Sequence, residues 1–373
     1  MHYHLPDLIR FHWEHNPSGQ IYAFPAGSTL QADTTAPSVR PLPESFSQVT
    51  YLEFGQAIHR AAHLMRPSPS SDGQDNEVVA MLAHSDTLVY LATVISLMTA
   101  GFVPLLISLR NSPVAIVNLL KTTGCHQILA TKETMKKLLA SVSDYISSSA
   151  PDYCLAVDEI PSLQQLYPYL GHELAEHPFR PYPELSKASF EDTALYIHSS
   201  GSTGFPKPIP ITHRSVWGYT ATCLLRELKD HPSPIRMGAM AIPAFHTLGF
   251  VLQIVYPLFG CITCTLFMPA VLDVENDVLV MPTPTNTLDV MERTGTTMTI
   301  IFPTFLQIWS QEEESMRRLK SFDYVASAGG PLDQKSGDTL LANSVNLRTS
   351  YGATEFDMVT HLRLHPGDEV DWM

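Results

Sequence analysis

The sequence has little positive charge. It carries 23 Lys and Arg against 37 Asp and Glu in 373 residues, a formal net charge of -14. Proteins that bind nucleic acid through its phosphates need clustered cationic side chains, so this balance argues against such a partner. Charged residues make up only 16% of the chain and hydrophobic residues 45%. Such a chain can bury a large core, and its length predicts about two domains or one large α/β unit.

Cysteine is also scarce, with 5 residues, an odd number too small for a secreted disulfide scaffold of this length. The first residues, MHYHLPDLIRFHWEHNPSG, lack the basic segment followed by an apolar segment that marks a secretory signal. Both absences favour a reducing compartment, and we expect the protein to be cytoplasmic.

One apolar run, Leu88 to Ser108, has the length of a membrane span. Gly101 and Pro104 interrupt it, which favours a buried helix followed by a strand. We therefore expect no membrane partner.

Several catalytic and metal-binding motifs are missing. No GxxxxGK[ST] loop occurs, which excludes a Walker-type nucleotide site, and no GxSxG turn supports a serine hydrolase. The histidines near the N-terminus have no spaced acidic or cysteine partner for zinc. Cys261 and Cys264 have CxxC spacing, but they lie in an apolar run without a second pair, which indicates a buried strand.

Apolar strand patterns alternate with helical patterns in two parts of the chain. In the first part we expect strands at Val78–Leu82, Phe102–Leu106 and Gln127–Ala130, with a helix that starts at Ser112 and ends at Gly124. After about residue 190 the expected strands are Ala194–Ile197, Gly238–Ile242, Ile262–Phe267, Thr299–Ile301, Tyr324–Ala326 and Arg348–Ser350, with a helical stretch at Ser215–Leu228. Strands and helices that alternate with short connections are typical of parallel sheets covered on both faces.

The predicted fold class is therefore α/β, with two βα-layered subdomains and mainly parallel sheets. We expect the first subdomain at residues 1–142 and the second, with the most informative motif, at 188–373. Residues 143–187 are irregular and rich in Ser, Pro and Tyr, which predicts a connector.

The most informative motif is His198 to Arg214, HSSGSTGFPKPIPITHR, between an expected strand and an expected helix. Its small and hydroxylated residues allow backbone N–H groups and hydroxyls to approach an anion closely, and Lys207 adds a cation. These residues are Ser199, Ser200, Gly201, Ser202, Thr203 and Gly204. The segment predicts a phosphate-binding loop. A flexible Ser/Gly loop with a solvated Lys is the alternative that composition alone leaves open.

This motif resembles the phosphate loop of the adenylate-forming superfamily, which includes acyl- and aryl-CoA ligases, luciferases and the adenylation domains of nonribosomal peptide synthetases. The PKPI ending is most similar to fungal synthetase-like enzymes that activate carboxylates other than amino acids, with Pro208 where Gly is commoner. Other similar blocks follow in order along the chain: Leu5–Pro17, Val49–Ala62, Thr99–Leu105, Pro243–Gly249, Ser327–Leu332 and Ser350–Glu355. The resemblance covers the whole chain.

The resemblance implies that a carboxylate attacks the α-phosphate of ATP, giving an acyl-adenylate and pyrophosphate. By this resemblance, residues 199–204 and Lys207 surround the β- and γ-phosphates, and Thr354 contacts the α-phosphate. Glu355 would ligate Mg²⁺, for which a hard carboxylate oxygen is suited. Lys207, His246, Thr354 and Glu355 are thus the candidate catalytic residues.

The adenine would lie against the backbone of Gly329 and Gly330 and stack on the ring of Tyr351. Taken alone, the segment SYGATE at 350–355 is equally a strand followed by a turn, with a solvated Glu. The functional interpretation depends on the phosphate-loop motif.

The substrate is indicated by His246, which follows Phe245 in AFHTLGF. Amino-acid-activating relatives commonly place an Asp there to pair with the substrate ammonium, and His246 cannot supply that counter-charge. We therefore expect an aryl, keto or other amine-free carboxylic acid. The expected pocket walls are Phe245, His246, Phe250, Ser327 and Met358. A core histidine bonded to backbone is the alternative for His246.

The chain reaches Met373 only 18 residues after Glu355, whereas family members continue for well over a hundred residues. We therefore expect the C-terminal lid domain, with its catalytic Lys, to be absent. Three hypotheses follow: the large part of an adenylate-forming ligase, a truncated or inactive relative that binds a nucleotide or carboxylate, and a fragment of an aryl- or acyl-CoA ligase. A carrier-protein domain or CoA would accept the acyl group.

Overall fold

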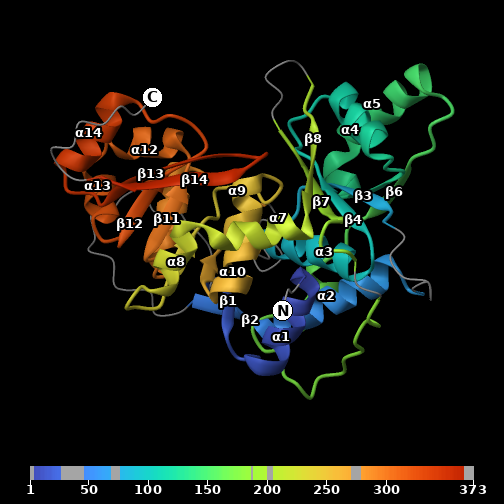
Figure 1. Cartoon of the computed structure of the whole chain (residues 1–373), viewed down its shortest axis with the longest axis horizontal. Coiled ribbons are helices and arrows are strands. Elements are labelled where there is room, and N and C mark those ends of the chain that lie inside the picture. The colour runs from blue at the N-terminus through green and yellow to red at the C-terminus, as the bar shows by residue number, and fades with distance from the viewer. Residues whose placement is uncertain are drawn as a thin grey trace.

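A computed structural model describes residues 4–26, 46–68, 76–185, 188–199, 205–269 and 279–364. Within these ranges the strands form two sheets, one of eight strands and one of six, which lie side by side with helices packed around and between them (Figure 1). Most neighbouring strands are parallel. The expected α/β fold with two mainly parallel sheets is confirmed.

The six-stranded sheet has the order β6-β5-β3-β4-β7-β8. Its strands are β3 (Val78–Leu82), β4 (Val103–Leu106), β5 (Gln127–Ala130), β6 (Ala156–Glu159), β7 (Thr193–His198) and β8 (Pro208–Thr212). Only the pair of β7 and β8 is antiparallel among these described strands, with His198 opposite Pro208 at its open end. This hairpin forms one edge of the sheet.

The eight-stranded sheet has the order β14-β13-β12-β11-β9-β10-β1-β2. Its strands are β1 (Gln20–Pro25), β2 (Phe46–Thr50), β9 (Arg236–Gly238), β10 (Thr263–Thr265), β11 (Met298–Ile301), β12 (Tyr324–Ser327), β13 (Leu347–Ala353) and β14 (Asp357–Arg363). An antiparallel pair closes each edge, β1 with β2 and β13 with β14. In the view of Figure 1, the β13–β14 hairpin points toward the β7–β8 hairpin of the other sheet.

The helices connect and cover these strands. They are α1 (Leu5–His15), α2 (Tyr51–Met65), α3 (Thr87–Thr99), α4 (Pro113–Thr123), α5 (Lys132–Ser149), α6 (Leu163–Leu166), α7 (His213–Gly218), α8 (Cys223–Lys229), α9 (Thr247–Phe250), α10 (Tyr256–Gly260), α11 (Pro284–Arg293), α12 (Pro303–Trp309), α13 (Glu313–Leu319) and α14 (Gln334–Ala342). A 3₁₀ turn, η1 (Tyr219–Ala221), follows α7, and a π-helical segment, η2 (Val251–Val255), joins α9 to α10.

Local sequence explains where α4 begins and ends. The Ser112 side chain accepts a hydrogen bond from the backbone N–H of Ala115, Pro113 occupies the first turn, and Gly124 ends the helix with a φ of 65°. Ser at the N-cap satisfies an amide that the helix leaves unpaired, and Gly tolerates the left-handed conformation at the C-terminus. The expected start at Ser112 and end at Gly124 are confirmed.

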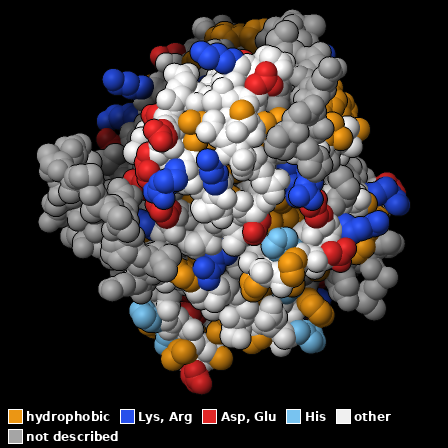
Figure 2. All heavy atoms as spheres, turned by 90° about the vertical axis from the view of Figure 1, so that its left-hand side faces the viewer, with side chains coloured by type: hydrophobic (Ala, Val, Ile, Leu, Met, Phe, Trp, Pro, Cys, Tyr) orange, Lys and Arg blue, Asp and Glu red, His pale blue; other side chains and the backbone are white. Residues whose placement is uncertain are grey.

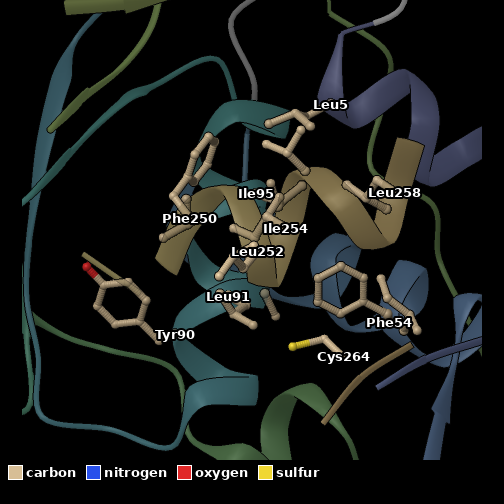
Figure 3. Close-up of a cluster of buried hydrophobic side chains, with 14 of the residues drawn as sticks. Leu5, Phe54, Tyr90, Leu91, Ile95, Phe250, Leu252, Ile254, Leu258 and Cys264 are labelled. Carbon is tan, nitrogen blue, oxygen red and sulfur yellow. The ribbon is translucent and has the colours of Figure 1, made fainter. Parts of the chain in front are cut away.

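The longest apolar run became a buried helix and strand, as expected. Residues 88–98 of α3 are buried all round the helix, which is typical of a helix inside a core. Figure 3 shows Leu91 and Ile95 of α3 beside Leu252 and Ile254 of η2. Side chains from α1, α2 and α10 complete this part of the core: Leu5, Phe54 and Leu258. The helical segment 247–260 therefore packs against elements from the N-terminal third of the chain.

Each sheet takes strands from both of the expected subdomains. β1 and β2 lie in the eight-stranded sheet with the later strands, whereas β7 and β8 lie in the six-stranded sheet with the earlier ones. Neither sheet is confined to one of the expected subdomains, 1–142 and 188–373. The division of the chain into domains stays a prediction. The stretch 143–187, expected to be irregular, contains the end of α5, all of β6 and α6. β6 was missed because only part of its short sequence AVDE is apolar, and its pairing with β5 is non-local.

The surface mixes charges of both signs. Figure 2 shows the face that carries α13 and α14, where basic and acidic side chains are interspersed. Arg317 pairs there with Glu314, and Arg318 pairs with Asp289 and Glu292. Among the residues with described positions, no helix is both long enough and apolar enough to cross a membrane.

Candidate active site

A cavity opens beside the β13–β14 hairpin. It has an empty volume of about 480 Å³, including its open mouth. Four parts of the chain line it: the start of α9, β11, the loop after β12, and the hairpin itself. The lining residues are His246, Thr247, Leu248, Ile300, Ala328, Gly329, Ser350, Tyr351, Gly352, Ala353, Thr354 and Met358. Five of the residues proposed from the sequence are among them, namely His246, Gly329, Tyr351, Thr354 and Met358.

The hairpin presents the residues of the segment SYGATE. The register of β13 against β14 shifts between Tyr351 and Gly352, and the turn closes with a hydrogen bond from Phe356 N to Ala353 O of 3.2 Å. Tyr351 is 64% exposed, and its ring centre lies 6.2 Å from that of Phe356 in a tilted arrangement, so much of the ring surface faces solvent. Thr354 is half-buried at the cavity, whereas Glu355 is exposed on the same turn and is not among the lining residues.

The two glycines after β12 have different roles. Gly329 has a φ of 84°, and a Cβ there would lie 2.7 Å from the Phe302 ring. Only glycine fits this combination of backbone conformation and close approach. A Cβ on Gly330 would meet nothing nearer than Pro303 at 3.8 Å, so that position has room for a side chain. Gly329 lines the cavity, and Gly330 does not.

His246 is the N-cap of α9 and also lines the cavity. Its Nδ1 accepts a hydrogen bond from Leu248 N at 3.3 Å, and its ring lies edge-on to Phe302, with 6.1 Å between the ring centres. Desolvation by the surrounding atoms lowers the pKa of His246, and nearby His198 lowers it further. His246 is exposed rather than part of the core, with Nδ1 engaged by a backbone N–H, and its role as a pocket wall stays a prediction.

Buried contacts from the following helical segment hold residues 239–243, just before His246, in place. Gln253, which is buried in η2, donates hydrogen bonds from Nε2 to Ala239 O at 2.9 Å and to Ile242 O at 2.7 Å. A Cβ on Gly249 would lie 2.1 Å from Pro243 O, so the helix packs directly on the backbone of this segment. These contacts place His246 at the mouth of the cavity.

The base of the predicted phosphate loop lies at the end of β7. Ser199 N donates a hydrogen bond to Lys207 O at 3.0 Å, one step beyond the β7–β8 ladder. Lys207 is exposed and Ser199 is half-buried. Ser200, Gly201, Ser202, Thr203 and Gly204 lie outside the described residues. His198, which precedes Ser199, lies near enough to the cavity residue His246 to lower its pKa.

The structure does not bring every predicted wall residue to this cavity. Phe245 instead lines a neighbouring cavity, together with Tyr90 and Leu109. Phe250 is fully buried in the core, and its ring appears there in Figure 3, because it lies inside the helical segment 247–260. Ser327 is buried at the end of β12, where its Oγ has no hydrogen-bond partner among the described residues.

Two residues at the site escaped the sequence interpretation. Phe302 packs against both His246 and Gly329, but its position in an apolar run gave no signal of this. His198 stands directly before Ser199, and this adjacency was the available signal. Its partners Ser108 and Asn111 are about ninety residues away in the sequence.

The donor set fits some ligands better than others. None of the twelve described residues that line the cavity is acidic. Over the described part of the chain, no group of three or more His, Cys, Asp or Glu could hold a metal ion. The described residues therefore do not support a metal site built entirely from protein ligands. Mg²⁺ commonly binds through one or two carboxylates together with water and substrate phosphates, which needs no such group.

Comparison with known proteins gives consistent results. The model of a family described as AMP-binding enzyme matches residues 29–372. Adenylate-forming reductase Nps9 of the fungus Serpula lacrymans var. lacrymans is 36% identical over 359 residues, which are 96% of this chain. That match covers 31% of Nps9, so the chain spans about a third of the length of this relative.

Two solved structures share the fold. The o-succinylbenzoate CoA synthetase of Bacillus subtilis, in complex with an acyl-adenylate intermediate, matches with a TM-score of 0.69 and 17% identity. The alignment covers 97% of this chain and 61% of that one. The N-terminal subdomain of Klebsiella oxytoca NpsA, in complex with 3-hydroxybenzoyl-AMSN, matches with a TM-score of 0.65 and 15% identity, covering 97% and 76%.

Proposed function

Because the chain belongs to the AMP-binding family of adenylate-forming enzymes, we propose that it activates a carboxylic acid with ATP and releases pyrophosphate. In this reaction a carboxylate oxygen attacks the α-phosphorus. The bond from that phosphorus to the oxygen bridging toward the β-phosphate breaks, and pyrophosphate leaves with that oxygen. The main support is the cavity that joins His246, Gly329, Tyr351 and Thr354 from three separate parts of the chain.

The nucleotide would lie along the β13–β14 hairpin. The exposed Tyr351 ring offers a face for adenine, and the backbone at Gly329 allows a flat ring to approach closely. The Thr354 hydroxyl, half-buried at the cavity, would donate a hydrogen bond to the α-phosphate.

The β- and γ-phosphates would extend toward the β7–β8 hairpin. The hydrogen bond between Ser199 and Lys207 closes the base of the loop, and the exposed Lys207 ammonium supplies a cation. Residues 200–204 would complete it. Mg²⁺ would screen the phosphate charge, and Glu355 is the carboxylate proposed to hold it.

The acid would be aryl or keto rather than an amino acid. An ammonium group buried without a counter-charge is strongly disfavoured, and none of the described lining residues is acidic. Leu248, Ile300 and Met358 give the cavity apolar walls, and Ser327, whose Oγ has no hydrogen-bond partner within the described part of the chain, directly precedes lining residue Ala328. Phe245 lines the neighbouring cavity and would contact the acid only from there. Phe250 is buried in the core and would act only by supporting the helical segment 247–260.

We further assign the chain to the large part of an adenylation domain of the nonribosomal-peptide-synthetase-like type, acting in specialised-metabolite biosynthesis. Its similarity to the fungal reductase Nps9 supports this assignment. The acceptor, a carrier-protein domain or CoA, stays a prediction from the resemblance.

ATP–pyrophosphate exchange over a panel of aryl, keto and amino acids tests the proposal. We expect exchange with an amine-free acid, and we expect Lys207→Ala and Glu355→Gln each to reduce it about 10²- to 10³-fold, as loss of one charge-stabilising group does. Lys229→Ala and Glu314→Gln are matched controls, because both residues are exposed on helices away from the cavity.

Two outcomes would count against the proposal in different ways. Binding of Mg·ATP without exchange for any acid would favour a relative that binds a nucleotide without turnover. Absence of both binding and exchange would refute the assignment of the cavity to a nucleotide.

A further inference from the structure

His198 makes three contacts that agree on one tautomer. Its Nε2 lies 3.0 Å from Ser108 N and 3.3 Å from Asn111 Nδ2, and its Nδ1 lies 3.3 Å from Ser199 O. The Ser108 amide and the Asn111 side-chain nitrogen only donate, so Nε2 must accept. The Ser199 carbonyl only accepts, so Nδ1 must carry the hydrogen. The imidazole is therefore neutral, with its proton on Nδ1.

The surroundings favour this neutral form. Desolvation by burial lowers the pKa of His198, although its contact with the Ser199 carbonyl opposes this. The nearby titratable group is His246, whose own pKa is lowered by burial first and by His198 second. A protonated His198 would have a hydrogen on Nε2 pointing at the Ser108 N–H, which would break that contact.

These contacts connect two separate elements. Ser108 is buried just beyond the end of β4, and Ser199 follows β7, the strand beside β4 in the sheet. Ser199 also gives its N–H to Lys207 O. Both backbone groups of Ser199 are thus hydrogen-bonded: its N–H to Lys207 O, and its carbonyl to His198 Nδ1.

We propose that His198 is a positioning residue, which ties the first residue of the phosphate loop to the end of β4 and thereby sets the affinity for the triphosphate of ATP. This inference rests on the proposed function. An anion-binding loop gains affinity when its donors are held in place before the ligand arrives, because less ordering is left for binding. His198 would act through Ser199 and need not touch the nucleotide.

The affinity for Mg·ATP, measured by calorimetry on the full chain, tests the proposal. His198→Phe keeps the ring but removes all three contacts, and we expect about tenfold weaker binding. His198→Gln provides a side-chain oxygen that can accept from Ser108 N–H, and we expect it to restore most of the affinity. His126→Phe is the matched control, because His126 is exposed, does not line the cavity, and contacts Cys154 O and the Tyr153 ring rather than the phosphate-loop base.

The outcomes separate this inference from the proposed function. If the wild type binds no Mg·ATP, the proposed function fails, and this inference fails with it. If the wild type binds and folded His198→Phe binds equally well, only the role of His198 is refuted. Equal weakening in His198→Gln and His198→Phe would refute the tie to Ser108.

A second measurement does not depend on nucleotide. In ¹⁵N-histidine NMR spectra near neutral pH, the wild-type His198 signals should show a protonated Nδ1 and an unprotonated Nε2. The signals are assigned by their loss in His198→Gln. A proton on Nε2, in either the other tautomer or the imidazolium, would overturn the proposal.

Discussion

The guanidinium of Arg348 lies 2.6 Å from the carboxylate of Glu227, measured from Nη1 to Oε2. The guanidinium carbon also lies 4.0 Å from the centre of the Tyr324 ring. Arg348 is buried near the start of β13, and Glu227 lies in α8. Because β13 continues to Tyr351, this pair anchors the strand that carries the proposed adenine contact.

Glu227→Gln should lower the free energy of unfolding by about 1–3 kcal/mol, because it removes the carboxylate that pairs with the buried Arg348 guanidinium. Denaturant unfolding measures the effect. Glu314→Gln removes the partner of Arg317 in an exposed pair and should change stability by less than about 0.5 kcal/mol. Equal effects of the two substitutions would show that the Arg348–Glu227 pair contributes no more than a surface pair.

Gly329→Ala should destabilise the protein more than Gly124→Ala, although both glycines have positive φ. A Cβ at Gly124 meets nothing within 4 Å, so only the backbone conformation costs energy there, about 1–2 kcal/mol. A Cβ at Gly329 would also press on Phe302, which adds about 1–3 kcal/mol. Thermal unfolding of both variants compares the two costs.

The steric origin of the Gly329 effect has its own control. In a Phe302→Leu background, Gly329→Ala should cost less than in the wild type, because the ring atoms that it meets are gone. An unchanged cost would show that the strain lies in the backbone alone. Because Phe302 also packs on His246, Gly329→Ala should weaken Mg·ATP binding as well.

Glu53 predicts a dependence of stability on pH. Its side chain is 1% exposed and accepts a hydrogen bond from Gly171 N at 2.6 Å. Burial raises the pKa of Glu53 from 4.5 to about 7, against the opposing effect of that hydrogen bond. The folded protein thus holds this proton more tightly than the unfolded chain does. The stabilisation is present below pH 4.5, is lost as the pH rises to about 7, and stays absent above that.

Glu53→Gln isolates this contribution, because Gln can still accept from Gly171 and does not titrate. The stability of the wild type relative to Glu53→Gln should fall between pH 4.5 and 7, by an amount on the order of 3 kcal/mol. Taking the difference between the two proteins removes the contributions of other titrating groups. One such group is His59, because burial lowers its pKa to about 4. A difference that stays constant across this range would contradict the prediction.

Local sequence predicted much of the fold where one element is self-contained. The expected strands Val78–Leu82 and Gln127–Ala130 match β3 and β5, because continuous apolar runs between turn residues allow little else. The expected strand Gly238–Ile242 is shifted, since β9 ends at Gly238. Gln253 takes the carbonyls of Ala239 and Ile242, which therefore do not pair with a neighbouring strand.

Non-local pairing explains what the sequence left out. Nothing near β1 indicates that it pairs with β10, more than two hundred residues later. β8 contains Pro208 and Pro210, which obscure a strand pattern and are tolerated because β8 is an edge strand. The same limit applies to the site, where resemblance supplied Tyr351 and Thr354 but the partners of His198 required the folded chain.

The distribution of strands over the two sheets has a consequence for dissecting this protein. A cut at residue 142 would remove the β7–β8 edge from one sheet and leave β1 and β2 without the strand they extend. Separately expressed halves should each present open backbone edges and associate with foreign strands. Co-expressed halves could complement one another, so reconstitution from two fragments would report directly on how the sheets assemble.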